Sequence, residues 1–124
     1  MSDVVDEQAR RYVYKILPAA EWADAEHRGS YGGSRDDQRD GFIHLSAADQ
    51  VAGTVARHFK GQGDLVLVTF PAAALGAALV WEPSRRGALF PHLYGPLPAA
   101  AAIGCVPLAL GADGVPVVPE GLLR

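Results

Sequence analysis

Two histidines and one glutamate are the residues of this chain best suited to acid–base chemistry. His44 lies in the segment GFIHLS, His92 lies in FPHLYGPL, and Glu82 comes directly before a proline turn. Imidazole has an unperturbed pKa close to neutrality, so it can act as acid, base or ligand. A carboxylate can act as a general base, bind a ribose or stabilise a cationic transition state. The three residues come from separate segments, so only the fold can bring them together.

His44 stands at the end of a short expected strand. Side chains alternate along a strand, so Phe42 and His44 share one face while Ile43 and Leu45 share the other. If Phe42 packs inward, His44 does too, at the edge of an apolar pocket. The alternative is a hydrogen-bonded core histidine without a functional role.

His92 and Tyr94 share a face of their own segment by the same alternation. A histidine beside a phenol can line a pocket for a planar or sugar-bearing ligand. A packed aromatic ladder on a sheet is the structural alternative.

Glu82 ends an apolar strand, where a carboxylate needs a partner. Arg85 and Arg86 follow closely, and a turn-stabilising ion pair with them is favoured over a catalytic role. The functional alternative is a general base or a carboxylate that stabilises a sugar cation.

Metal and thiol chemistry have little support. His44, His92 and Glu82 match a known catalytic zinc set in residue type, but no spacing requires it, so no metal is expected. Cys105 is the single cysteine and cannot form an internal disulfide. We expect it to be a small buried side chain in a strand rather than a nucleophile. His27 and His58 are expected at the surface, near helix ends.

Runs of β-branched and aromatic residues predict most of the strands. They lie at 12–17, 42–45, 64–70, 78–82, 90–97 and 103–110, and the 64–70 run (DLVLVTF) reads as central and buried. One helix is expected after Pro18, ending at Gly29. A second is expected from Ser46, whose SAAD resembles a capping box, to about Lys60.

Glycine-rich and polar residues 29–41 predict a loop, which in a compact domain is often functional. A turn is expected at 72–76, and loop-like tails at 1–10 and 112–124, with a DG turn at Asp113–Gly114. Strands outnumber helices, and both main helices fall in the first half. The pattern indicates one α+β domain over 1–124, with a mixed or antiparallel, possibly split, sheet.

Composition narrows the classes of partner. The 124 residues are 49% hydrophobic and 20% charged, with a net charge of −3. There is no basic stripe of the kind that nucleic-acid binding needs. No apolar run approaches the roughly 20 residues that span a bilayer, and the N-terminus is polar, so a cytoplasmic protein is expected. Oligomeric state is left open.

The motifs together resemble the bacterial DUF952 family of unknown function. The matching pieces are YKIL (14–17), EW (21–22), GFIHLS (41–46), Gln50, DLVLV (64–68), WE (81–82) and FPHLYGPL (90–97). They stand in collinear order across roughly residues 12–98. The family's fold is similar to the ADP-ribosyltransferase scaffold, a small split sheet that grips a dinucleotide.

The resemblance implies a pocket for NAD or an ADP-ribose-like ligand, with NAD as a substrate. Under it, Glu82 is the catalytic carboxylate and His44 contacts the ribose. Lys15, near the place where the scaffold often carries a histidine, could meet a phosphate. The remaining ligand-binding candidates are His92, Tyr94, Ser46 and Trp81. The enzyme would be ADP-ribosyltransferase-like or glycohydrolase-like, and the alternative is a non-catalytic module that binds a small metabolite or a protein.

Overall fold

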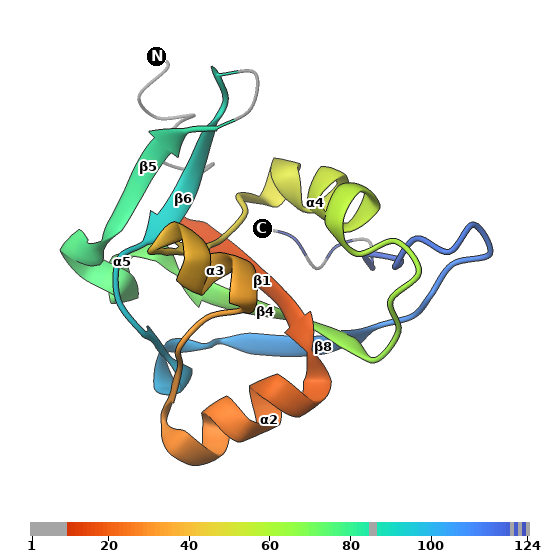
Figure 1. Cartoon of the computed structure of the whole chain (residues 1–124), viewed down its shortest axis with the longest axis horizontal. Helices are drawn as coiled ribbons and strands as arrows, with labels where there is room; N and C mark the ends of the chain where they lie inside the picture. The colour runs from red at the N-terminus through yellow and green to blue at the C-terminus, as the bar shows by residue number, and fades with distance from the viewer. Residues whose placement is uncertain (1–9, 85–86, 120, 122, 124) are drawn as a thin grey trace.

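The computed structural model describes residues 10–84, 87–119, 121 and 123 (Figure 1). Its helices are α2 (Ala19–Arg28), α3 (Arg35–Asp40), α4 (Val51–His58) and α5 (Ala72–Leu75). Its strands are β1 (Tyr12–Pro18), β2 (Ser30–Tyr31), β3 (Ile43–His44), β4 (Leu65–Pro71), β5 (Leu79–Pro83), β6 (Leu89–Leu93), β7 (Leu97–Pro98) and β8 (Gly104–Leu108). Residues 1–9 of the tail expected over 1–10 lie outside the described residues.

A three-stranded antiparallel sheet in the order β1-β4-β8 forms the centre of the molecule. The prediction that residues 64–70 form a central buried strand is confirmed, because Leu65 to Phe70 are all buried in β4. A strand covered on both faces reads as a continuous apolar run rather than an alternating one. That is why DLVLVTF gave such a clear signal.

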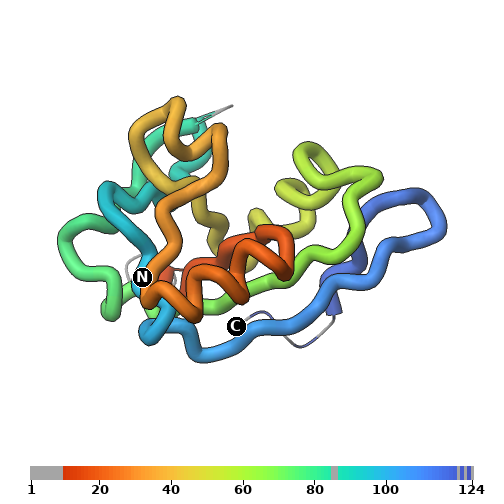
Figure 2. Tube along the Cα trace, turned by 60° about the horizontal axis from the view of Figure 1, so that its bottom comes forward, coloured from red at the N-terminus to blue at the C-terminus, as the bar shows by residue number. Residues whose placement is uncertain are grey.

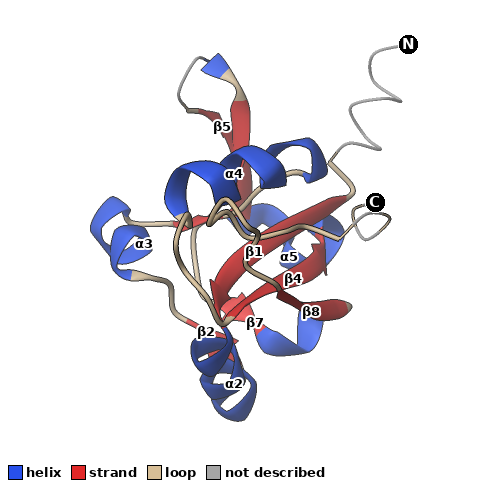
Figure 3. Cartoon of the chain, turned by 90° about the vertical axis from the view of Figure 1, so that its right-hand side faces the viewer, coloured by secondary structure: helices blue, strands red, loops and turns tan. Residues whose placement is uncertain are grey.

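The two faces of this sheet support two separate cores. On one face, Val51 and Val55 of α4 pack with Tyr14 and Leu67. On the other face lie α2, which contributes Trp22, and the strands β3 and β6. Figure 3 shows α2 and α4 on opposite sides of the sheet. Each long helix therefore covers a different face of β1 and β4.

The remaining strands form two small sheets, β3-β6-β5 and β2-β7. Every strand pair among the described residues is antiparallel. Figure 2 shows the chain around β3 beside β6, two segments far apart in the sequence. The α+β class with a split, antiparallel sheet is confirmed, and the two longest helices lie in the N-terminal half.

The first helix has the predicted boundaries. Pro18 precedes α2, and Gly29 ends it in the left-handed conformation with φ = 98°. Glycine adopts this conformation without the steric penalty that a Cβ brings. The residues at the two ends of α2, Pro18 and Gly29, therefore determine where the helix begins and ends.

We expected residues 29–41 to form a loop. The structure shows instead that this segment contains β2 and α3. The hydroxyl of Ser34 accepts a hydrogen bond from the Asp37 amide, and the Asp37 carboxylate accepts one from the Ser34 amide. This is a complete capping box, which satisfies two N–H groups at the start of a helix. All six residues of α3 are polar, so hydrophobic periodicity gives no sign of it.

The cap predicted at Ser46 is also wrong. The helical segment begins one residue later, where the Gln50 side chain accepts from the Ala47 amide. Ser46 instead pairs its backbone with Tyr14 and its hydroxyl with Thr54. The helix ends at His58 rather than near Lys60.

Three other expectations need correction. Residues 72–75 form the short helix α5 instead of a simple turn. The run 90–97 is divided into β6 and β7 by the bend around Gly95. Cys105 lies in a strand as predicted, but it is exposed rather than buried, and its strand β8 is at the edge of the sheet.

Candidate functional site

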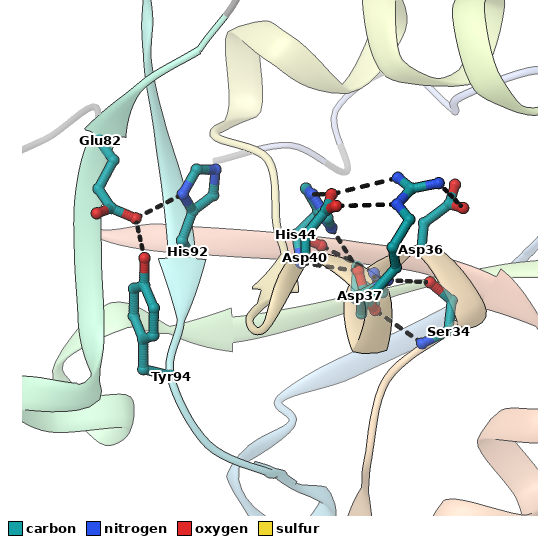
Figure 4. A network of polar contacts seen from close by, with 10 residues as sticks. Ser34, Asp36, Asp37, Asp40, His44, Glu82, His92 and Tyr94 are labelled. Atoms are coloured by element: carbon teal, nitrogen blue, oxygen red, sulfur yellow. Dashed lines mark hydrogen bonds and ion pairs between the residues drawn. The ribbon is translucent and has the colours of Figure 1, made fainter.

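The Asp37 carboxylate is the centre of a buried polar network (Figure 4). Its side chain is 2% exposed. Oδ2 accepts hydrogen bonds from the Ser34 amide (2.8 Å) and from Lys15 Nζ (2.9 Å). Oδ1 accepts from the His44 amide (3.0 Å) and contacts His44 Nδ1 (2.6 Å). Four donors on one buried carboxylate tie α3, β1 and β3 together.

Electrostatics keep Asp37 ionised. Burial alone would raise its pKa, but the hydrogen bond from the His44 ring and the charge of Lys15 outweigh that effect. The pKa of Asp37 therefore lies well below its ordinary value. The carboxylate is a fixed anion at neutral pH.

Lys15 lies beneath His44 rather than at the protein surface. Its ammonium donates to Asp37 and to the His44 carbonyl, both at 2.9 Å. Burial lowers the pKa of Lys15, and the neighbouring Asp37 opposes that shift. Because Nζ is buried and engaged, Lys15 is placed to support His44 rather than to meet a ligand phosphate.

Phe42 and His44 share a face, as alternation predicts, but Phe42 does not pack into the core, so the condition for an inward-facing His44 is not met. Ile43 and Leu45 point into the core, so Phe42 and His44 lie on the outer, partly exposed face of β3. The His44 side chain is 39% exposed, with Nδ1 on Asp37 and Nε2 at 2.9 Å from Asp40 Oδ2. The imidazolium form donates to both carboxylates at once.

Glu82 forms the second network, shown on the left of Figure 4. Its Oε1 accepts from the Tyr94 hydroxyl and contacts His92 Nδ1, both at 2.7 Å. The hydrogen bond from Tyr94 lowers the pKa of Glu82 most, and the hydrogen bond from His92 lowers it further. The expected shared face of His92 and Tyr94 is confirmed. The ion pair predicted with Arg85 and Arg86 lies outside the described residues.

The strand register joins the two networks. His44 on β3 stands directly opposite His92 on β6, and their ring centroids are 5.7 Å apart. The Phe42 ring stacks on His92 at 4.0 Å and contacts His44 at 4.7 Å. Two imidazoles, each with Nδ1 on a carboxylate, therefore lie side by side on one face of the β3-β6-β5 sheet. We call this set, with Glu82 and Tyr94, the histidine face.

A cavity of about 310 Å³ adjoins the histidine face. Its lining combines three glycines with apolar side chains and the carboxylate-bearing α3 segment: Gly32, Asp37, Gln38, Gly41, Phe42, Ile43, Leu93, Gly95 and Pro96. Its size falls at the small end of ligand pockets. Asp37 and Phe42 belong both to this lining and to the networks around His44.

Not every predicted ligand-binding residue joins the histidine face. Trp81 neighbours Glu82, so alternation turns it to the other side of β5. There it stacks with Arg10, whose guanidinium carbon is 5.0 Å from its ring, and lines a separate hollow of about 270 Å³. Ser46 is buried against Thr54.

Asp37 and Asp40 are site residues that the sequence analysis did not identify, whereas Phe42 was predicted only to share a face with His44. A signal for Asp37 was present, since Ser34 and Asp37 have capping-box spacing. Asp40 gave no local signal of contact with His44, because it is the turn at Gly41 that brings the end of α3 back beside β3. No group of three or more His, Cys, Asp or Glu side chains in the described ranges is arranged to hold a metal ion. Nor is any described helix long and apolar enough to cross a membrane.

Fold and site define a small α+β protein that carries two adjoining histidine–carboxylate pairs on one sheet face. The chain belongs to the family described as "Protein of unknown function (DUF952)", which matches residues 16–105. The crystal structure of protein CC0527 from Caulobacter crescentus is similar, with 50% sequence identity and a TM-score of 0.83. That match covers 86% of this chain and 93% of CC0527. The solution NMR structure of CC0527 matches with a TM-score of 0.76 and 50% identity, over 85% of this chain and 90% of that one. Comparison with curated proteins found no match.

Proposed function

We propose that the histidine face binds a ribose-bearing, anionic ligand of the ADP-ribosyl class, such as NAD, and slowly cleaves its glycosidic bond. The observation that carries the proposal is the side-by-side placement of His44 and His92, each with Nδ1 held by a carboxylate. A carboxylate on Nδ1 fixes the tautomer and the orientation of each imidazole ring. The choice of ligand class rests on the similarity to the ADP-ribosyltransferase scaffold that the family resemblance implies.

Glu82 is suited to the charge that develops in such a reaction. Two donors orient its carboxylate and lower its pKa, so it stays anionic at neutral pH. An anion beside the ribose stabilises the oxocarbenium-like centre. The bond between ribose carbon and nicotinamide nitrogen breaks with its electron pair on nicotinamide. Water then adds to the ribose carbon, and His92 takes the proton that the water loses.

Titration with NAD, ADP-ribose and nicotinamide, followed by two-dimensional amide NMR, tests binding. We expect shifts at residues 42–46, 81–82 and 90–95, and their loss in a folded His44→Ala variant. Retention of native amide dispersion is the control for folding. If none of the three ligands produces shifts at millimolar concentration, the ADP-ribosyl class is wrong.

Glu82→Gln tests catalysis separately from binding. The amide keeps an oxygen for the Tyr94 hydroxyl but loses the negative charge. We expect NAD affinity to change little while nicotinamide release slows at least about tenfold, or roughly 1.4 kcal/mol of transition-state stabilisation. Nicotinamide release is measured by chromatography. Equal release by both proteins would show that Glu82 does not act in cleavage.

Gly32→Leu tests whether the ligand enters the adjoining cavity. The backbone of Gly32 is not in the left-handed region, and an added Cβ would meet no atom within 4 Å. Leucine therefore fits at this position, and its side chain takes the space in the cavity that a ligand would occupy. We expect stability within about 0.5 kcal/mol of the parent and ADP-ribose affinity lowered about tenfold. Gly63→Leu is the matched control, because Gly63 has the same freedom and lies outside the lining. Equal affinities of the two variants would place the ligand elsewhere.

A non-catalytic binding module is the second candidate, and one observation favours it. Asp40 already occupies Nε2 of His44, and the Phe42 ring covers one side of His92. Side chains that satisfy one another in this way suit recognition of a small metabolite or a protein without bond breaking. Ligand binding without turnover, unaffected by Glu82→Gln, is the expected result for this candidate.

A further inference from the structure

The Asp40 carboxylate lies between a guanidinium group and an imidazole. Arg39 Nε is 3.0 Å from Asp40 Oδ1, and Arg39 Nη2 is 3.4 Å from Asp40 Oδ2. The same Oδ2 is 2.9 Å from His44 Nε2. Figure 4 shows Asp40 beside His44. The position beside Nε2 of His44 is thus already occupied by an anionic oxygen, which belongs to the protein's own Asp40.

We propose that this position is a subsite for a phosphate or pyrophosphate group of the ligand, and that Asp40 occupies it as an internal competitor. The proposal rests on the proposed function, because it specifies where the anionic part of that ligand binds. Carboxylate and phosphate both match the planar fork of an arginine. Phosphate carries more charge and more oxygens than the carboxylate that it displaces.

Asp40 is much less firmly held than Asp37. Its side chain is 32% exposed, so it can turn into solvent, whereas Asp37 is 2% exposed and accepts from four donors. Asp40 is also the last residue of α3, where backbone carbonyls make a negative charge unfavourable. The network on Nδ1 of His44 therefore stays in place when the carboxylate on Nε2 leaves.

Asp36 provides a matched comparison within the same helix. Its Oδ1 lies 3.2 Å from Arg39 Nη1, so it neutralises the same guanidinium as Asp40 does. No contact joins Asp36 to His44. Asp36→Ala and Asp40→Ala raise the net charge equally, but only the second vacates the position at Nε2.

The experiment is a titration of the full chain with inorganic pyrophosphate at one fixed pH, following the imidazole ¹⁵N and ¹H signals of His44. We expect Asp40→Ala to bind pyrophosphate about tenfold more tightly than the parent and Asp36→Ala to bind it within about threefold of the parent. His44→Gln in the Asp40→Ala background should lose the gain. Equal tightening by both alanine variants would reduce the effect to net charge and overturn the subsite. Absence of His44 shifts at millimolar pyrophosphate in Asp40→Ala would overturn it as well.

Pyrophosphate has no ribose, and its binding does not depend on Glu82. The experiment can therefore reject the phosphate subsite and the ADP-ribosyl ligand class independently of each other. Tighter pyrophosphate binding by Asp40→Ala without any response to NAD or ADP-ribose upholds the subsite and rejects the ADP-ribosyl class. NAD binding that Asp40→Ala leaves unchanged upholds the ligand class and rejects the subsite.

Discussion

Asp37→Ala is expected to lower the free energy of unfolding by about 3–5 kcal/mol, the usual effect of breaking a buried ion pair from one side. The substitution leaves the Lys15 ammonium, whose side chain is 8% exposed, without its carboxylate. It also leaves the amides of Ser34 and His44 without their acceptor. Urea denaturation at neutral pH, followed by circular dichroism, measures the change.

The doubly substituted variant Lys15→Met, Asp37→Leu is the control for this mechanism. It removes both charges and replaces them by apolar side chains of similar length. Replacing a whole buried pair costs far less than removing one partner, so we expect the double variant to regain at least half of the lost stability. If the double variant is as unstable as Asp37→Ala, the loss comes from the helix cap and the backbone contacts rather than from the unpaired ammonium.

The parts of the fold that could be predicted from the sequence are those determined by neighbouring residues. The strand β4 is a run of apolar residues interrupted only by Thr69 and ended by Pro71, and that pattern needs no knowledge of the partner strands. The helix α2 has Pro18 before it and Gly29 after it. Local signals of this kind specify an element and its ends.

The helix α3 could not be predicted in the same way. It has six polar residues and no apolar face, so its stability depends on contacts that Asp37 makes with distant parts of the chain. Lys15 is 22 residues away from Asp37, and nothing near Ser34 indicates that an ammonium will be buried there. A short polar helix that holds a buried charge looks like a loop in the sequence.

The candidate site was predicted as a set of residues but not as an arrangement. His44, His92, Glu82 and Tyr94 were identified from residue type and alternation, and they do meet on one face. Which face points outward depends on strand register, and a shift of one residue reverses every side chain. The common face of Phe42 and His44 was predicted, but its direction was left to depend on Phe42, and the structure shows that Ile43 and Leu45 fill the core instead.

Acid is expected to destabilise the protein chiefly through Asp37. The pKa of this carboxyl is lower in the folded chain than the value near 3.9 of an unperturbed aspartate. The unfolded chain therefore takes up the proton first as pH falls, which favours unfolding. The contribution of Asp37 to stability is fully present above about pH 5 and disappears progressively as pH falls through the folded-state pKa. Each unit of difference between the two pKa values corresponds to about 1.4 kcal/mol.

Urea midpoints at pH 7, 5, 4 and 3 measure this contribution in the parent and in the Lys15→Met, Asp37→Leu variant. Other carboxyl groups titrate in both proteins, so the difference between the two acid slopes isolates the buried pair. Glu82 adds a small slope to both, because its carboxylate is solvent-screened although Tyr94 and His92 lower its pKa. We expect the parent to lose stability more steeply below pH 5 than the variant. Identical slopes would mean that Asp37 is not held as an anion by Lys15 and His44. The orientation of the His44 ring would then need another cause.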